Sequence, residues 1–415
     1  MFQWGRKGAR NSRAEVTFAR HAALVSACAV GLFSTGIMRT LCWPAVLHEV
    51  RLSANCPPSF ELVQGICEFR SLYDLYTAGP GAAGLRVQLP PLQGRFTPQQ
   101  IDLGRYLFFD PLLSSDHQLS CASCHQPSRS FADGRGRSRN SHGTLLARGA
   151  PPLWNVGFLN NLRWDGSAHS LTQQVRGPLF SPDEMANTEQ QLERELNQNA
   201  AYSALFAEAF QLRSKGRITV NLLARALAAF ESTLISFNSR YDRYAHGDAN
   251  ALNAQERRGF ELFRGVTLAC SQCHTPPLFT NDEIEVTGVP NAPGMAFDAG
   301  AGTTTRDRAH RGAFRTPSLR NVAQTSPYMH AGQFESLRDV VRFYNDRAGH
   351  AAPREEDLQI DWRMILARPL LSDDEVDAVV AFLRTLSDES MMPAIPRQVP
   401  SGFPVVGAKI RGPGL

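Results

Sequence analysis

The sequence carries almost no net charge once its N-terminal segment is set aside. Residues 1–51 contain seven Lys or Arg residues and two Glu residues, while the whole chain has a formal charge of +4, so the rest of the chain is close to −1. Binding of nucleic acid depends largely on excess basic charge, which the rest of the chain lacks. We therefore expect no nucleic-acid partner.

Segments that alternate polar and apolar residues are also scarce, which argues against a sheet-based fold. Apolar residues recur instead with helical spacing, and Gly/Pro-rich loops separate these stretches. The hydrophobic fraction of 43% and the charged fraction of 20% are those of an ordinary globular protein. The sequence therefore predicts a mainly α fold. The helical stretches are residues 99–108, 188–211, 220–237, 253–264, 336–345 and 374–386.

The first 51 residues have the pattern of a targeting segment. Five basic residues between positions 6 and 20 precede an apolar run at 22–38, which is typical of a secretory signal or a short membrane anchor. Because no small-residue cleavage site stands out, the signal and the anchor both remain possible. A cytosolic amphipathic segment is the third alternative. We expect export to the periplasm, where Cys56 and Cys67 can close a disulfide loop.

Four other cysteines form two close pairs, each in a C-x-x-C-H motif. In this motif the cysteines are suited to thioether bonds with a haem, and the histidine is suited to bind its iron. The motifs stand 149 residues apart, too far for a zinc ribbon, and a reactive dithiol does not need the histidine. The sequence predicts two covalently bound haem c groups. The attaching residues are Cys121, Cys124 and His125 in the first motif and Cys270, Cys273 and His274 in the second.

The two motifs belong to two similar halves of the chain. A G-x-x-L-F segment precedes each motif, at 104–108 and at 259–263. After each motif comes a W/H-x-G-x-x-x-S-L pattern, at 164–171 and at 330–337. Because these matches keep their order and spacing, we interpret the chain as an internal repeat of two cytochrome c-like domains.

The repeat register pairs Pro178 with Tyr344, each seven residues beyond the S-L pattern. A phenol oxygen can bind iron, whereas proline cannot, so the register predicts a closed second haem and an open first haem. An open iron binds small molecules such as peroxide, and a six-coordinate iron mainly passes electrons. Taken alone, Tyr344 would be interpreted as a core residue of its helix. The prediction that it binds iron therefore depends on the repeat.

Polar residues close to Pro178 suit peroxide chemistry. Glu184 can act as the acid/base that moves a proton between the two peroxide oxygens, and Gln174 lies one helical turn before Pro178. Taken alone, Glu184 would be a solvated surface residue. Trp164 would likewise be a core residue by default, but its place between the two halves suits an electron relay.

The motifs together are identified as those of a known family. The segments LGRYLFFDPLLS, CASCH, FADGR, WDGS, GPLFSPDEM, CSQCH, FRTPSLRNVAQTSPYMHAG and VVRFYN resemble the bacterial di-haem cytochrome c peroxidase and MauG superfamily over residues 95–390. The resemblance implies a peroxidatic first haem and an electron-transfer second haem. It also implies that Trp164 is the inter-haem tryptophan and that Gln174, Pro178 and Glu184 line the peroxide pocket.

The second-haem ligand separates the branches of this family. In its peroxidases a methionine follows the histidine of the P-Y-x-H motif by fourteen residues, whereas fourteen residues after His330 this chain has Tyr344, the MauG-type ligand. A phenolate favours the higher oxidation states of iron. The implied partners are hydrogen peroxide and either a small c-type cytochrome or cupredoxin as electron donor, or a protein substrate. Whether the chain forms a homodimer stays open.

Two positions depart from the family pattern. The peroxidase branch often has a removable histidine ligand in the loop after the first motif, and His142 lies there about one residue out of register, so it is either a ligand or an exposed loop residue. The family's calcium ion uses an asparagine whose matching position is Gly149. Only the carbonyl groups of Thr325 and Pro327 then remain as possible calcium ligands, and calcium usually binds a larger number of oxygen atoms.

Three functions follow from these predictions. The leading one is a peroxidase that reduces hydrogen peroxide at the first haem, while the second haem relays or stores oxidising equivalents. The alternatives are a MauG-like oxidase of a partner protein and a non-enzymatic electron-transfer cytochrome. The expected segments are a signal or anchor (1–51), an irregular segment (52–94), the peroxidatic domain (95–245), the electron-transfer domain (246–395) and a tail (396–415).

Overall fold

The structure is a computed structural model of the chain. It describes residues 25–31, 39–45, 50–70, 89–213, 216–265, 269–346, 357–361, 370–388 and 390–407. The chain forms two compact units, Met1–Val50 and Arg51–Leu415. In the first unit, β1 (Val25–Gly31) pairs antiparallel with β2 (Arg39–Ala45), while the basic residues of the predicted signal lie outside the described residues. None of the described helices is long and apolar enough to cross a membrane.

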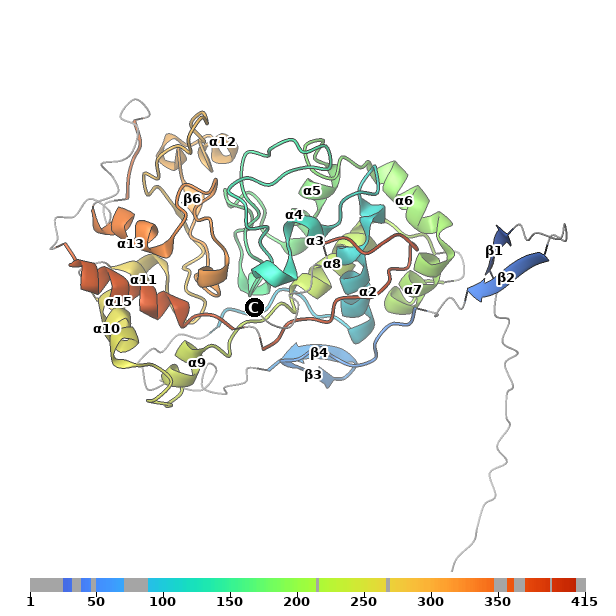
Figure 1. Cartoon of the computed structure of the whole chain (residues 1–415), viewed down its shortest axis with the longest axis horizontal. Helices are drawn as coiled ribbons and strands as arrows, with labels where there is room; N and C mark the ends of the chain where they lie inside the picture. Colours follow the sequence, from blue (N-terminus) through green and yellow to red (C-terminus); the bar gives the residue numbers. More distant parts are fainter. Residues whose placement is uncertain are drawn as a thin grey trace, which may run out of the picture. The chain divides into compact units, whose positions relative to one another are not determined.

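The second unit is rich in helices and contains few strands, which confirms the predicted α-rich class (Figure 1). Among the described residues of this unit, strands occur in two short antiparallel pairs, β3 (Phe60–Val63) with β4 (Ile66–Phe69) and β5 (Ile284–Glu285) with β6 (Phe314–Arg315). The longer helices are α2 (Pro98–Phe109), α6 (Glu189–Gln198), α7 (Ala200–Phe210), α8 (Val220–Glu231), α10 (Ala254–Arg264), α13 (Leu337–Asn345) and α15 (Asp373–Arg384). The shorter helices include α3 (Cys121–Cys124), α4 (Leu171–Gln174), α5 (Arg176–Phe180), α9 (Arg240–Ala245), α11 (Cys270–Cys273) and α12 (Gly302–Thr305).

Two helix pairs form the corresponding frames of the two halves: α2 packs on α8, and α10 packs on α15 (Figure 1). Both contacts are made at a glycine of the G-x-x-L-F segment. Gly104 lies against the carbonyl group of Ala226, and Gly259 lies against that of Ala378, so neither position leaves space for a Cβ atom. The sequence repeat is therefore also a repeat of helix packing.

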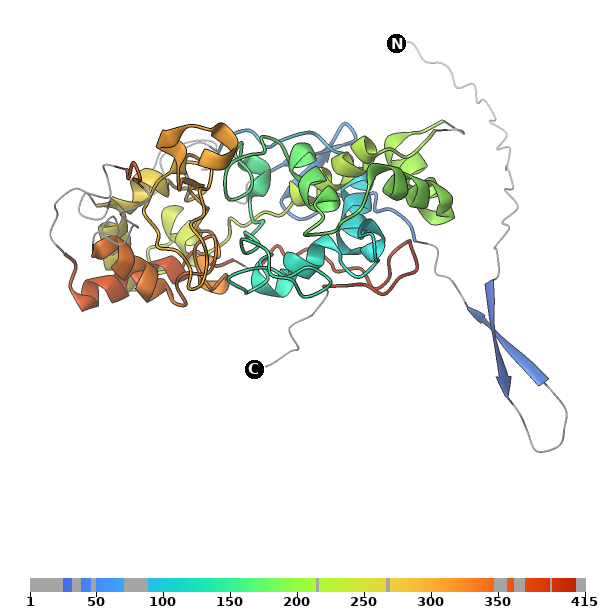
Figure 2. The ribbon, with the colours of Figure 1, turned by 90° about the horizontal axis from the view of Figure 1, so that it is seen from above.

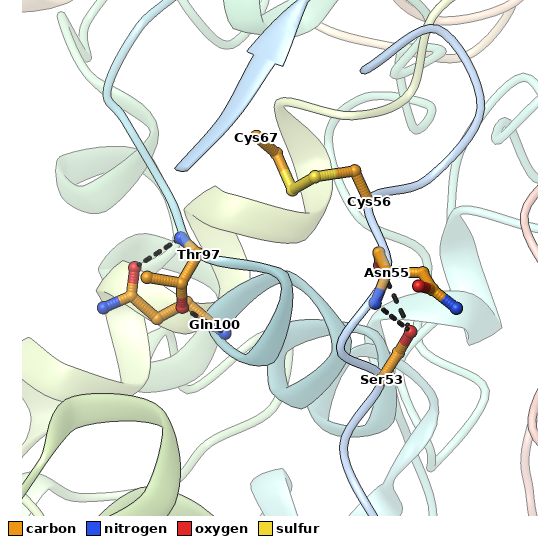
Figure 3. Close-up of a disulfide and its surroundings, with 6 residues drawn as sticks. All are labelled: Ser53, Asn55, Cys56, Cys67, Thr97 and Gln100. Carbon is orange, nitrogen blue, oxygen red and sulfur yellow. Dashed lines mark hydrogen bonds between the residues drawn. A yellow bond between two sulfur atoms is a disulfide. The ribbon is translucent and has the colours of Figure 1, made fainter. Parts of the chain in front are cut away.

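The helices that precede the haem motifs begin where their capping residues predict. The Gln100 backbone N–H donates to Thr97 Oγ1, and the Thr97 backbone N–H donates to Gln100 Oε1, both over 3.2 Å (Figure 3). Asn253 and Glu256 exchange the same two hydrogen bonds, over 2.8 and 2.9 Å. These capping boxes satisfy backbone donors that the first turn of a helix leaves free.

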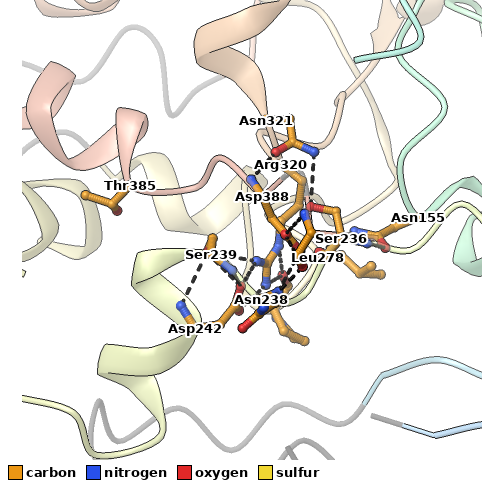
Figure 4. Close-up of polar contacts among 12 residues, drawn as sticks. Asn155, Ser236, Asn238, Ser239, Asp242, Leu278, Arg320, Asn321, Thr385 and Asp388 are labelled. Atoms are coloured by element: carbon orange, nitrogen blue, oxygen red, sulfur yellow. Dashed lines mark hydrogen bonds and ion pairs between the residues drawn. The ribbon is translucent and has the colours of Figure 1, made fainter. Parts of the chain in front are cut away.

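Two asparagines repeat the same buried contact in the two halves. Asn155 and Asn321 both have φ near +60°, and their backbone N–H groups donate to the carbonyls of Leu234 and Leu386. The Asn155 side chain also accepts from the backbone N–H of Ser236, and the Asn321 side chain accepts from that of Asp388 (Figure 4). Each asparagine thus ties the loop after a haem motif to the segment that follows the packed helix.

A buried ion pair joins three segments of the second half. Arg320 donates to both carboxylate oxygens of Asp242, over 2.6 and 2.9 Å, and both side chains are 0% exposed (Figure 4). The guanidinium also donates to the Pro277 carbonyl and lies over the rings of Phe237 and Phe279. Buried charges of this kind are stable only when every donor is paired.

Irregular segments at both ends of the second unit pack on the first half. Cys56 and Cys67 form the predicted disulfide beside the β3–β4 hairpin (Figure 3). After α15 the chain runs back past α2 in both views (Figures 1 and 2), where Ser401 Oγ donates to Asp110 over 2.7 Å. The Val406 carbonyl accepts a hydrogen bond from Ser120, next to the first haem motif.

Candidate active site

The first C-x-x-C-H motif forms one short helix, α3, with His125 at its C-cap. The Nδ1 atom of His125 lies 2.9 Å from the Phe131 carbonyl oxygen, so it carries the proton and leaves the lone pair on Nε2. Burial lowers the pKa of His125, which keeps the imidazole neutral. A neutral imidazole held in this tautomer is suited to bind a metal.

The second motif has the same arrangement on α11. The Nδ1 atom of His274 lies 3.1 Å from the Pro317 carbonyl oxygen and 3.2 Å from that of Phe279. Burial lowers the pKa of His274 to about 4, so this imidazole is also neutral with its lone pair on Nε2. The two motifs therefore present equivalent histidines.

None of the four motif cysteines forms a disulfide bond. Burial raises the pKa of Cys121 above its usual range and that of Cys124 to about 12, which opposes the thiolate form that zinc and redox dithiols require. In the part of the chain that the structure describes, no cluster of three or more His, Cys, Asp or Glu side chains could hold a metal ion. This chemistry fits thioether attachment better than a zinc site.

Each motif lines a cavity. The first cavity, of about 1110 Å³, is lined by Cys121, Cys124 and His125, and the second, of about 220 Å³, is lined by Cys270, Cys273 and His274. In each cavity two sulfur atoms and one imidazole come from a single turn and its cap, which is the donor set that a c-type haem needs. The residues present therefore fit a haem in both cavities.

The first cavity also contains the residues predicted for peroxide chemistry. Gln174, Pro178 and Glu184 all line it. Burial raises the pKa of Glu184, the Arg163 guanidinium opposes this effect, and Asp183 adds to it. The result is a carboxyl group that takes up and releases a proton closer to neutral pH than an exposed glutamate does.

The second cavity contains Tyr344 at the position that corresponds to Pro178. Both register positions follow a serine N-cap, because Ser170 Oγ accepts from Gln173 N–H and Ser336 Oγ accepts from Asp339 N–H. Burial raises the pKa of Tyr344, the thiols of the second motif add to this, and a hydrogen bond with the Thr287 side chain opposes it. The phenol therefore lies close to the thiols of the second motif.

Trp164 and Arg315 line both cavities. The indole Nε1–H of Trp164 donates to the Gly149 carbonyl over 2.8 Å, and the Trp164 carbonyl accepts from the Arg315 backbone N–H over 2.8 Å. These bonds fix the indole in the wall between the cavities. Arg315 is 5% exposed, and its Nε donates to the Arg163 carbonyl.

The two positions that depart from the family pattern are the loop that contains His142 and the predicted calcium site. His142 is exposed, its backbone N–H donates to Asn140 Oδ1, and it is absent from the described residues that line the two cavities. Thr325 and Pro327 do line the second cavity. A Cβ at Gly149 would lie 2.9 Å from the carbonyl oxygens of residues 135 and 136, so no side chain fits where the family has its asparagine. Calcium binding by the Thr325 and Pro327 carbonyls therefore stays a prediction, with few oxygen ligands from the protein.

Sequence reasoning missed several charged residues of these cavities, and three of them bear on the site. Arg163 acts on Glu184, Arg315 lines both cavities, and Glu231 lines the first. Only Glu231 left a signal in the repeat: it is the third residue of AFESTL, at 229–234, which matches AFLRTL at 381–386. Arg163 comes from a loop and Arg315 from β6, and the repeat does not predict how these segments pack.

Two equivalent C-x-x-C-H motifs, each lining a cavity that fits a haem, are the features of a two-haem redox protein. Comparison with known proteins agrees. A family model described as di-haem cytochrome c peroxidase matches residues 98–250. The methylamine utilization protein MauG of Methylorubrum extorquens is 36% identical over 308 residues, which cover 74% of this chain and 83% of that protein. The cytochrome c551 peroxidase of Pseudomonas aeruginosa is 32% identical over 305 residues, covering 72% and 82%.

Solved structures show the same relationship. A MauG-like protein associated with microbial copper homeostasis superposes with a TM-score of 0.67 at 31% identity, covering 74% of this chain and 97% of that one. The diheme peroxidase BthA of Burkholderia thailandensis gives a TM-score of 0.63 at 29% identity, covering 86% and 100%. The chain belongs to the di-haem cytochrome c peroxidase and MauG family, and it is therefore an oxidoreductase with two haem groups.

Proposed function

We propose that this chain is an exported, periplasmic di-haem peroxidase that reduces hydrogen peroxide to water in the first cavity. The observation that carries the proposal is the contrast at one register position. Pro178 lines the first cavity and cannot bind iron, whereas Tyr344 lines the second and can. Peroxide therefore has access to one of the two iron atoms.

The chain would hold each haem through one motif. Cys121 and Cys124 would form thioether bonds with the first haem, and His125 Nε2 would bind its iron; the second motif would do the same with His274. When bound, the two haems supply an iron site for peroxide and a second centre that stores or passes electrons. The remaining steps are those of the side chains.

Glu184 acts on the protons of the substrate. Its carboxylate would take a proton from one peroxide oxygen and deliver it to the other, departing oxygen, so that Glu184 itself is unchanged after the step. Reduction of one hydrogen peroxide to two waters also consumes two electrons and two protons from outside this step. Gln174 shares the cavity wall and can orient the substrate by hydrogen bonding.

Electrons would reach the first cavity through Trp164, which lines both cavities and is held by its hydrogen bond to the Gly149 carbonyl. The donor would be a small c-type cytochrome or a cupredoxin. Tyr344 would act as an oxygen ligand of the second haem, which lowers its reduction potential relative to a thioether ligand. Such a centre is suited to storing oxidising equivalents.

This low potential favours a second candidate function, the MauG-like oxidation of a partner protein. Addition of hydrogen peroxide to the fully ferric protein, with no electron donor, separates the two. A spectral change that persists and involves both haems supports MauG-like oxidation. Rapid return to the starting spectrum, or no reaction until the second haem is reduced, supports the peroxidase.

The E184Q variant tests the role of the carboxyl group. Loss of a positioned acid/base typically lowers the rate by about 10²–10⁴-fold, so peroxide consumption should fall by that factor with the haem content unchanged. E208Q is the matched control, because Glu208 is an exposed glutamate of α7 that is not among the residues lining either cavity. Unchanged turnover in E184Q would instead support a non-enzymatic electron-transfer cytochrome.

A further inference from the structure

Glu231 is a buried carboxyl group that the proposed mechanism does not use. It ends α8, it lines the first cavity, and it is 5% exposed. No side chain or backbone group among the described residues hydrogen-bonds to its carboxyl group. Burial alone raises its pKa, to about 8, and Glu231 in turn raises the pKa of Cys121. The carboxyl group is therefore protonated at neutral pH and lies close enough to the first motif to act on its charge.

The second half of the chain shows what this position otherwise contains. Gly104 packs on Ala226 and Phe230 of α8, and Gly259 packs on residues 378 and 382 of α15 in the same way. The residue after each phenylalanine is Glu231 in α8 and Leu383 in α15, and Leu383 lines the second cavity. The two cavities thus differ by a carboxyl group in place of an isobutyl group at an equivalent point of the wall.

Stability does not account for this difference. An unpaired buried carboxyl group destabilises a fold, whereas a leucine at the same position packs without an unsatisfied polar atom. Four elements pack against α8: α2, α4, α6 and the 3₁₀ turn at Val156–Phe158. α4 and this turn contain no ionisable residue, and the ionisable residues of α2 and α6 are not among the causes of the raised Glu231 pKa. Those residues are Asp102, Arg105 and Tyr106 on α2, and Glu189, Glu193, Arg194 and Glu195 on α6.

The carboxyl group instead suits a site whose charge changes. We propose that Glu231 holds a proton while the first haem is reduced and releases it when that haem is oxidised. Oxidation adds one positive charge to the cavity and so favours the carboxylate, because an opposite charge nearby stabilises the ionised form. One electron leaves the haem and one proton leaves Glu231, so the net charge of the site is unchanged. The proton can supply one of the two that the reduction of peroxide consumes.

This inference shares one assumption with the proposed function, namely that a haem is attached at Cys121. Its test is an equilibrium redox titration of the full-length two-haem protein at several pH values, without peroxide, with the haems followed separately by their spectra. If one proton accompanies one electron, the potential of the first haem falls by up to about 59 mV per pH unit, the value for a tenfold change in proton concentration. In E231Q and E231L this dependence should be lost.

Two controls make the result specific. E193Q removes a carboxyl group from α6, outside both cavities, and should keep the dependence of the wild type. E184Q tests the peroxidase proposal through peroxide turnover, whereas E231Q and E231L test this inference through the pH dependence of the first-haem potential, so the two proposals can fail separately. E231L introduces the residue that the second half has at this position. If E231L does not fold with both haems, E231Q serves instead, because glutamine has nearly the same shape as glutamate. An unchanged pH dependence in the folded E231 variants, or its loss in E193Q, would overturn the assignment.

Discussion

The contact between α2 and α8 provides a direct test of how the frame supports the first cavity. In G104A the added carbon would lie 2.6 Å from the carbonyl carbon of Ala226 and 2.9 Å from Phe230 Cβ. The Ala226 carbonyl oxygen would lie closer still, and an ordinary contact begins at 3.4 Å, so α8 must move by more than about 0.8 Å at this carbonyl. Because Leu227 and Glu231 of α8 line the first cavity, this movement displaces the cavity wall.

The energetic effect combines two opposing contributions. Overpacking of a tight contact destabilises a protein by about 1–3 kcal/mol. Replacement of a helical glycine by alanine returns about 0.5–1 kcal/mol of backbone entropy. We expect G104A to lower the free energy of unfolding by about 1–2 kcal/mol and to reduce the Tm by a few degrees, measured by circular dichroism.

The repeat supplies the matched control for this variant. G259A introduces a similar clash, 2.5 Å from the carbonyl carbon of Ala378, but it displaces α15, which lines the second cavity through Val379 and Leu383. Each variant should therefore disturb the absorbance and potential of the haem in its own half. Wild-type stability in both variants, or an equal disturbance of both haems by either one, would refute this account of the frame.

Three further predictions concern single side chains. Y344F removes the oxygen ligand, so the spectrum of the second haem should change and its potential should rise, while peroxide binding at the first haem stays intact; unchanged second-haem spectra would exclude Tyr344 as a ligand. D242N leaves the Arg320 charge buried without its anion, so the free energy of unfolding, measured with denaturant, should fall by about 3–5 kcal/mol. E261Q removes one partner of the exposed Arg264–Glu261 pair and should lower it by less than about 1 kcal/mol. Because Glu184 must be ionised to accept a proton and burial raises its pKa, turnover should fall with decreasing pH at values above 4.5, the ordinary pKa of glutamate, and E184Q should lack that fall.

Local rules explain which parts of the site could be predicted. The position of Tyr344 follows from a serine cap, a short helix and seven residues of helical register, all of which are encoded within one segment. The capping boxes and the asparagine contacts are local or repeated in the same way. Arg163 and Arg315 could not be found by this reasoning, because their places depend on how loops far apart in the sequence pack against Trp164.

The two halves share their frame, so their different chemistry must come from few side chains. The glycine contacts, the asparagine contacts and the histidine tautomers are equivalent in both. The walls differ at Pro178 against Tyr344, the pair that we propose controls access to the iron, and at Glu231 against Leu383, the pair that we propose controls proton storage beside it. These two differences act together, since a carboxyl group that releases a proton is useful only at the haem where peroxide is reduced. A second haem that only stores or relays electrons has no such need, and its cavity has a leucine at that position.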